Sequence, residues 1–136
     1  MKAIIGLTAI ALIAGCASEA TRDQELARQM SFFVASTAPA KGADAGGVAG
    51  ADQHCQSLAA AVGAGNKNWR AYLNETPSVN ARERIGRGPW YNANGVIIAK
   101  NVEDLRANPN INRQTALTEK GDLVEGSGGL YCFAAN

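Results

Sequence analysis

The chain has 136 residues, with 13 basic and 12 acidic side chains and one histidine. This length suits one domain with a single hydrophobic core. The near-neutral charge gives no electrostatic basis for binding nucleic acid or a broad anionic membrane surface. Fifteen glycines and only 6% aromatic residues indicate many turns rather than long helices.

Residues 1–15 have the pattern of an export signal. Lys2 follows the first Met, and residues 3–14 are mostly Ala, Ile and Leu. A membrane-spanning helix needs about 20 apolar residues, so this stretch is too short to be one. The alternative of a core strand or helix fits a terminal apolar stretch less well. The string LIAGC, which ends at Cys16, resembles the signal of bacterial lipoproteins.

This resemblance implies cleavage before Cys16, whose thiol then carries a diacylglycerol. We therefore expect an exported protein that is lipid-anchored to the cell envelope. Ala17, rather than an aspartate, follows the cysteine, which implies the outer membrane. Removing residues 1–15 takes away Lys2 alone among the charged residues, so the remaining chain is formally neutral. Its remaining cysteines are Cys55 and Cys132, in a compartment where disulfides persist.

The first part of the remaining chain predicts a tether, a strand and a loop. Residues 16–30 are mostly small or charged and show no clear helical period, which indicates a lipidated tether with at most a helical turn. The apolar run Phe32–Ala35 predicts the first strand. Residues 38–50 hold four glycines, which favours a loop.

A helix is predicted next, from about Asp52 to Val62. Asp52 would lie near its positive end, and Gly63 would stop it. Cys55, Leu58, Ala59 and Val62 recur at i, i+3, i+4 and i+7, so Cys55 is expected to face the core.

The second half of the chain predicts short strands and a second helix. Alternation indicates a strand over 68–73, and Asn-Gly at 94–95 favours a hairpin that returns over 96–99. Asn101 can cap a short helix. Residues 130–134 predict the last strand. The expected domain, 31–136, is a compact α+β fold of short antiparallel strands with about two helices.

Several long strings in this domain resemble a family of bacterial proteins described as lectins and related to endostatin. The strings are FVAS (33–36), GGVAGADQHCQ (46–56), WRAYL (69–73), VNARERIG (79–86) and GPWYN (88–92). The resemblance covers nearly everything from Ser31 to Cys132. It implies a C-type-lectin-like fold in which a disulfide joins Cys55 on the helix to Cys132 in the last strand.

The chain departs from this family in the long-loop region. Fuller members carry a long segment with a second cysteine pair between TEKG (118–121) and the terminal strand, whereas here only Asp122–Ser127 fills that gap. C-type lectins that use calcium hold their ligands in that region, on a Glu-Pro-Asn loop and a Trp-Asn-Asp strand. This chain has neither, so calcium-dependent sugar binding is not expected.

The candidate ligand-binding residues are the aromatic and polar side chains around the hairpin. Aromatic rings suit the apolar faces of sugars, and amides or a guanidinium supply hydrogen bonds. The candidates are Trp90, Tyr91, Asn92, Asn94 and Arg84. A structural role for Trp69 and Trp90 is the favoured alternative. The basic group Arg82, Arg84 and Arg87 fits either a patch for sulfated glycans or an ordinary solvated face with one salt bridge.

The sequence predicts no catalytic or metal site and no cofactor. His54 adjoins Cys55, but neighbours on a helix point about 100° apart, so they do not form a nucleophile and base pair. We therefore expect a non-catalytic, lipid-anchored recognition module, with carbohydrate as its ligand. The alternative is a structural or adhesion lipoprotein that binds an envelope protein and has lost the sugar site with the missing segment.

Overall fold

The computed structural model describes residues 15–39, 46–126 and 129–136, with side chains described from residue 19 onward. The predicted signal, residues 1–15, lies outside this part except for Gly15. The fold is α+β, as expected, and compact. Its elements are α1 (Gly15–Gln29), β1 (Phe32–Val34), α2 (Gly47–Ala61), β2 (Asn68–Ala71), the 3-10 helix η2 (Ala81–Arg84), β3 (Trp90–Tyr91), β4 (Ile97–Ala99), α3 (Val102–Ala107) and β5 (Tyr131–Ala135).

The main sheet has three strands in the order β1-β5-β2, and β5 is antiparallel to both neighbours. Cys132 at its centre faces Phe33 on one side and Ala71 on the other. A second, two-stranded antiparallel sheet is formed by β3 and β4. The four longer predicted strands are confirmed, with bounds shifted by up to two residues. The last strand, β5, is the central strand of the main sheet.

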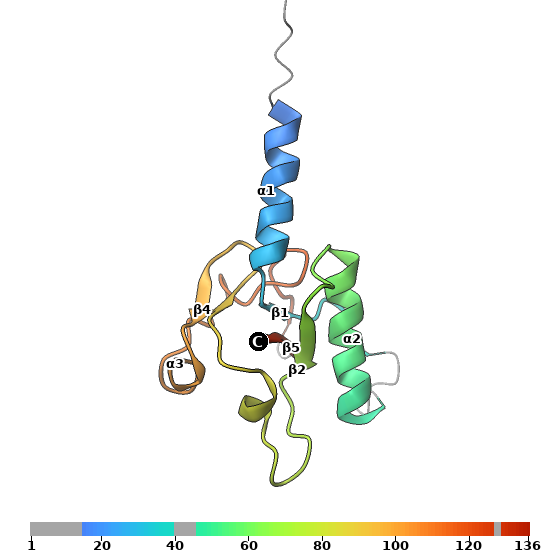
Figure 1. The fold of residues 1–136 in the computed structure, drawn as a ribbon, viewed down its shortest axis with the longest axis vertical. Helices are drawn as coiled ribbons and strands as arrows, with labels where there is room; N and C mark the ends of the chain where they lie inside the picture. Colours follow the sequence, from blue (N-terminus) through green and yellow to red (C-terminus); the bar gives the residue numbers. More distant parts are fainter. Residues whose placement is uncertain (1–14, 40–45, 127–128) are drawn as a thin grey trace, which may run out of the picture.

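The strands of the main sheet bury both faces, because successive side chains point to opposite sides. One face carries Phe33, Trp69 and Cys132 and packs against α2. The other carries Phe32 and Phe133 and packs against the β3–β4 hairpin and α3. Figure 1 shows α2 on one side of the sheet and the hairpin with α3 on the other. Two small cores thus share one sheet.

A disulfide joins Cys55 of α2 to Cys132 of β5, as the family resemblance implies. Both cysteines are fully buried. The bridge closes a loop over a sequence separation of 77 residues, for which the chain-entropy model gives a stabilisation of about 4.5 kcal/mol. It fixes α2 over the central strand of the sheet.

Residues 15–29 form the helix α1, whereas the sequence predicted at most a helical turn within the tether over residues 16–30. This is also why the described part of the chain holds three α-helices rather than two. Figure 1 shows α1 projecting away from the body of the domain. Of its side chains from residue 19 onward, those of Leu26 and Ala27 are partly buried and the others are exposed, so this part carries no long apolar stripe that would predict a helix.

Lys67 closes the C-terminal end of α1. Its Nζ donates to the carbonyl oxygen of Met30 at 2.6 Å and to that of Arg28. A cation is favourable at this end of a helix, where carbonyl groups lack intrahelical partners. Burial lowers the pKa of the Lys67 ammonium below its ordinary value of 10.5. The base of α1 is thus fixed to the segment that leads into β2.

The predicted start of α2 is corrected. The helix begins at Gly47, so Asp52 lies in its second turn rather than near its positive end. The end of the helix at Ala61 agrees with the prediction to within one residue. The Asp52 carboxylate instead accepts a hydrogen bond from the Ala71 amide of β2.

The predicted hairpin is confirmed. The Asn92 amide donates to the Val96 carbonyl at 2.9 Å, and the Gly95 amide donates back to the Asn92 carbonyl at 3.0 Å. Gly95 has φ +76, and a Cβ there would lie 3.0 Å from Oε1 of Gln29 on α1. A side chain is therefore disfavoured both by backbone conformation and by space. Asn101 caps α3 as predicted, accepting from the Asp104 amide at 2.9 Å.

Candidate functional site

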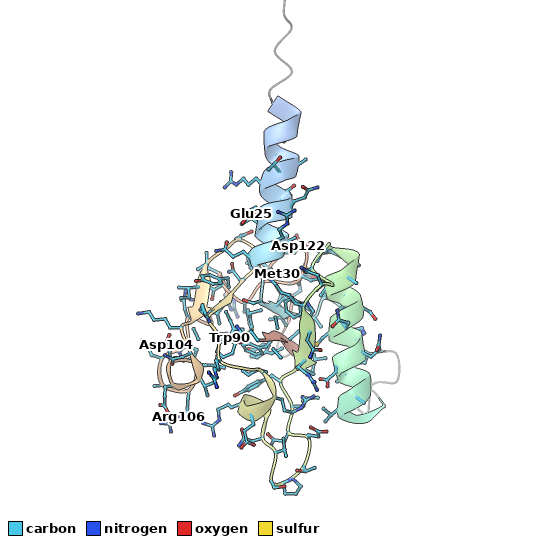
Figure 2. All side chains as sticks on the ribbon, in the orientation of Figure 1. Glu25, Met30, Trp90, Asp104, Arg106 and Asp122 are labelled. Atoms are coloured by element: carbon cyan, nitrogen blue, oxygen red, sulfur yellow. A yellow bond between two sulfur atoms is a disulfide. The ribbon has the colours of Figure 1, made fainter. Side chains whose placement is uncertain are left out.

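Trp90 is a core residue, which corrects its prediction as a ligand platform. Its side chain is 0% exposed and stands edge-on to Phe133, with ring centroids 5.5 Å apart. Its indole N–H donates to the Ala134 carbonyl at 3.2 Å. Figure 2 shows Trp90 in the middle of the domain. The alternative structural interpretation applies to Trp69 as well, which is 1% exposed.

Asn92 is also withdrawn from the list of ligand-binding residues, because its amide holds the hairpin. The side chain is 1% exposed. Its Oδ1 accepts from the backbone amides of Asn94 at 3.0 Å and Val96 at 2.9 Å, and its Nδ2 donates to the Thr115 carbonyl at 3.1 Å. These contacts use the polar groups that a ligand would need.

The prediction of Arg84 as a ligand-binding residue is also corrected, because its guanidinium is buried in the protein rather than presented to a ligand. The side chain is 3% exposed, and NH1 donates to the Ala71 carbonyl at 2.7 Å. NH2 pairs with the carboxylate of Asp52, and Nε lies 3.5 Å from Glu75. The patch for sulfated glycans therefore loses its central member, while Arg87 stays exposed.

These contacts close the outer edge of β2. An unpaired strand edge would leave its amide and carbonyl groups without partners. Here the Trp69 amide donates to Oε1 of Gln56 at 3.0 Å, and the Ala71 amide donates to Oδ1 of Asp52 at 2.8 Å. Gln56 lies one turn after Asp52 on α2, so the two acceptors match alternate residues of the strand. Arg84 supplies the donor for the edge carbonyl.

Tyr91 is more exposed than its neighbour Trp90 on β3, and the pairing with β4 shifts register between the two residues. It is half-buried and lines a hollow of about 390 Å³. The side chains around it include Gln29, Asn66, Asn68, Pro89 and Asn136. Within the described part of the chain, the Tyr91 hydroxyl and the side-chain amides of Asn66 and Asn68 make no hydrogen bond to protein. We call this the Tyr91 hollow.

The backbone of Tyr91 is held firmly beneath the ring. Its amide donates to Oγ of Ser31 at 2.8 Å, and its carbonyl accepts from the Ser31 amide at 2.9 Å. The backbone that carries the ring is thus fixed to the segment before β1.

Asn94 lies in a different place from Tyr91. It is exposed and lines a hollow of about 370 Å³ beside α1, together with Asp23 and Lys120. Of the five candidate residues, three are therefore buried, and the remaining two, Tyr91 and Asn94, line separate hollows. Cys16 lies in the first turn of α1, and its side chain is outside the described part.

Sequence reasoning missed an exposed apolar feature around Leu123. Leu123 is 64% exposed, more than any other large apolar residue in the described ranges. It lines two hollows, of about 530 and 970 Å³. The sequence does carry a signal for it: the apolar pair Leu123-Val124 lies in an otherwise polar segment, Asp122–Ser127.

His54 and Cys55, the neighbours considered as a catalytic pair, both have structural partners. Nε2 of His54 lies 2.7 Å from the Thr37 carbonyl, and Cys55 is in the disulfide. Within residues 15–39, 46–126 and 129–136, no three His, Cys, Asp or Glu side chains are grouped so as to hold a metal ion. In the same ranges, no helix has both the length and the apolar composition needed to cross a bilayer.

Comparison with known proteins adds no relative: no family model, curated protein or solved structure matches the chain.

Replacing Arg84 tests its role in closing the edge of β2. We expect Arg84→Ala to lower the free energy of unfolding by about 1 to 3 kcal/mol, because it leaves the buried Ala71 carbonyl without the Arg84 donor, while Asp52 keeps Arg70 at 3.7 Å. Arg87→Ala, which removes an exposed arginine from the same basic group, should change it by about 0.5 kcal/mol or less. Urea unfolding followed by tryptophan fluorescence measures both. Equal stabilities of the two variants would contradict the structural role.

Proposed function

We propose that this chain is an exported, lipid-anchored recognition domain with a C-type-lectin-like fold, which binds carbohydrate without calcium and without catalysis. Two features support the fold: the first strand, β1, pairs with the last, β5, and a disulfide ties α2 to that last strand. The disulfide agrees with what the endostatin-related resemblance implies. The first and last strands of the domain, β1 and β5, thus lie side by side in the main sheet.

The Tyr91 hollow is the proposed sugar site, and the outward-facing Tyr91 ring is the observation that carries the proposal. A sugar ring offers an apolar face for an aromatic ring and hydroxyl groups for amides. The hollow combines one tyrosine with the amide side chains of Gln29, Asn66 and Asn68, each of which can both donate and accept. The Asn136 amide is already bonded to Arg87 and Gly88. Lys67 also lines it, but its ammonium is bound to the carbonyls of α1. The lining therefore favours a neutral glycan over a sulfated one.

The proposed anchor uses the position of Cys16 at the beginning of α1. Cleavage before Cys16 would leave α1 nearly whole, and 15 helical residues span about 22 Å. Because Lys67 fixes the base of the helix, α1 would act as a stalk of defined direction between the lipid and the domain. The Tyr91 hollow, which includes Gln29 of α1, would lie at the end of the domain near the stalk.

Mass spectrometry of the mature N-terminus tests the anchor. We expect the first residue to be Cys16, carrying a diacylglycerol on its thiol. Cys16→Ser should leave an uncleaved or unanchored protein with the disulfide between Cys55 and Cys132 intact. An unmodified Cys16 in the membrane fraction, or cleavage at another position, would contradict the anchor.

Replacing Tyr91 tests the sugar site. Tyr91→Ala should reduce binding to arrayed neutral glycans by about tenfold or more, with the domain still folded, because it removes the stacking surface. Asn94→Ala, in the other hollow, should bind as the parent protein does. Trp90→Ala should instead cost about 3 to 5 kcal/mol of stability, since it empties a core position.

Two outcomes would contradict this function. One is glycan binding that survives Tyr91→Ala in a folded protein. The other is binding that is lost with EDTA and restored by calcium.

A further inference from the structure

The Leu123 ridge, formed by Leu123 and Val124, has a large apolar side chain in solvent between two hollows. The first hollow is lined by the apolar residues Val34, Ile111, Ala116 and Tyr131, with Asn112 and Arg113 among its polar residues. The second is lined by residues 35–39, Thr118, Asp122 and Glu125. Leu123 and Val124 belong to both linings. From this geometry we propose that the ridge is a docking site for an extended peptide segment of a partner protein.

The backbone that carries the ridge is fixed by the fold. The Thr118 amide donates to the Asp122 carbonyl at 2.9 Å, and Leu117 and Leu123 pair as an antiparallel bridge. The turn between them is tied to the end of β1, where Glu119 accepts from the Ser36 amide at 3.1 Å. Glu119 is only 4% exposed. A rigid ridge loses little conformational entropy when a segment binds to it.

The charges around the two hollows indicate which charges a bound peptide segment carries. Arg113 borders the first hollow, whereas Asp122 and Glu125 border the second. In the described ranges none of these three side chains has an ion pair, and all three are exposed. The complementary segment carries an acidic residue at one end, a basic residue at the other, and apolar side chains between them.

An extended peptide fits this arrangement better than the other occupants. Alternate side chains of an extended chain point to the same side, so two of them can enter the hollows on either side of a ridge. An anionic membrane would be repelled by Asp122 and Glu125, and a neutral sugar would leave all three charges without partners. This site is distinct from the Tyr91 hollow, with which it shares no lining residue.

Three labelled synthetic peptides test the proposal by fluorescence anisotropy with the whole chain. The first has the pattern Asp-Ser-Leu-Ser-Leu-Ser-Lys, in which the charged and apolar side chains point to the same side of an extended chain. The second has aspartate at both ends, and the third has serine in place of both leucines. We expect the first to bind at least about tenfold more tightly than the other two. Because a peptide can bind in either direction, the all-acidic peptide is the informative charge control.

Variants of the ridge make the test specific. Leu123→Asp should abolish binding of the first peptide, whereas Leu73→Asp, at another exposed leucine, should leave it unchanged. The double variant Asp122→Lys with Glu125→Lys should bind the all-acidic peptide at least about tenfold better than the parent protein does. Such a reversal would not follow from misfolding.

Several results would overturn the proposal. They are equal affinity for the three peptides, binding that survives Leu123→Asp, or no change of preference in the lysine variant. A dimer in sedimentation analysis that Leu123→Asp converts to monomer would assign the ridge to a second copy of the chain instead. Binding of the parent protein to phosphatidylglycerol vesicles, lost in Leu123→Asp, would assign it to a lipid surface.

Discussion

The carboxylate of Asp52 is the contact on which the arrangement of this domain depends. It accepts from the Ala71 amide on β2 and pairs with the buried Arg84 of η2, so one side chain of α2 joins three elements. Gln56 repeats the contact to β2 one turn later. The disulfide holds the same helix over β5. A three-stranded sheet this small would otherwise expose an open edge, and here α2 closes it.

This framework determines which hairpin residue is available to a ligand. Trp90 fills the core on one side of the sheet, where Phe133 and the Ala134 carbonyl receive it. Its neighbour Tyr91 is only half-buried and lines the Tyr91 hollow. In the short segment after Gly121, Leu123 is exposed to solvent. The two proposed binding features are thus the parts of the chain that the core does not use.

Local patterns predicted what depends on local chemistry. The spacing around Cys55, the Asn-Gly hairpin and the Asn101 cap each involve residues a few positions apart. Arg84 and Asp52 are 32 residues apart, so no pattern in the sequence could show that they pair. Alternation implies that Trp90 and Tyr91 face opposite sides, but the side that is buried depends on β5. Helix α1 was not predicted because, among its side chains from residue 19 onward, Leu26 and Ala27 alone are partly buried.

Amide hydrogen exchange of the Ala71 N–H tests the closed edge most directly. The account predicts that Ala71 exchanges as slowly as Tyr72, whose amide donates to the Tyr131 carbonyl of β5 at 2.8 Å. Asp52→Ala should speed exchange at Ala71, while Asp52→Asn, which keeps the acceptor oxygen, should preserve part of the protection. Exchange at Ala71 as fast as at an exposed loop amide in the parent protein would contradict the account.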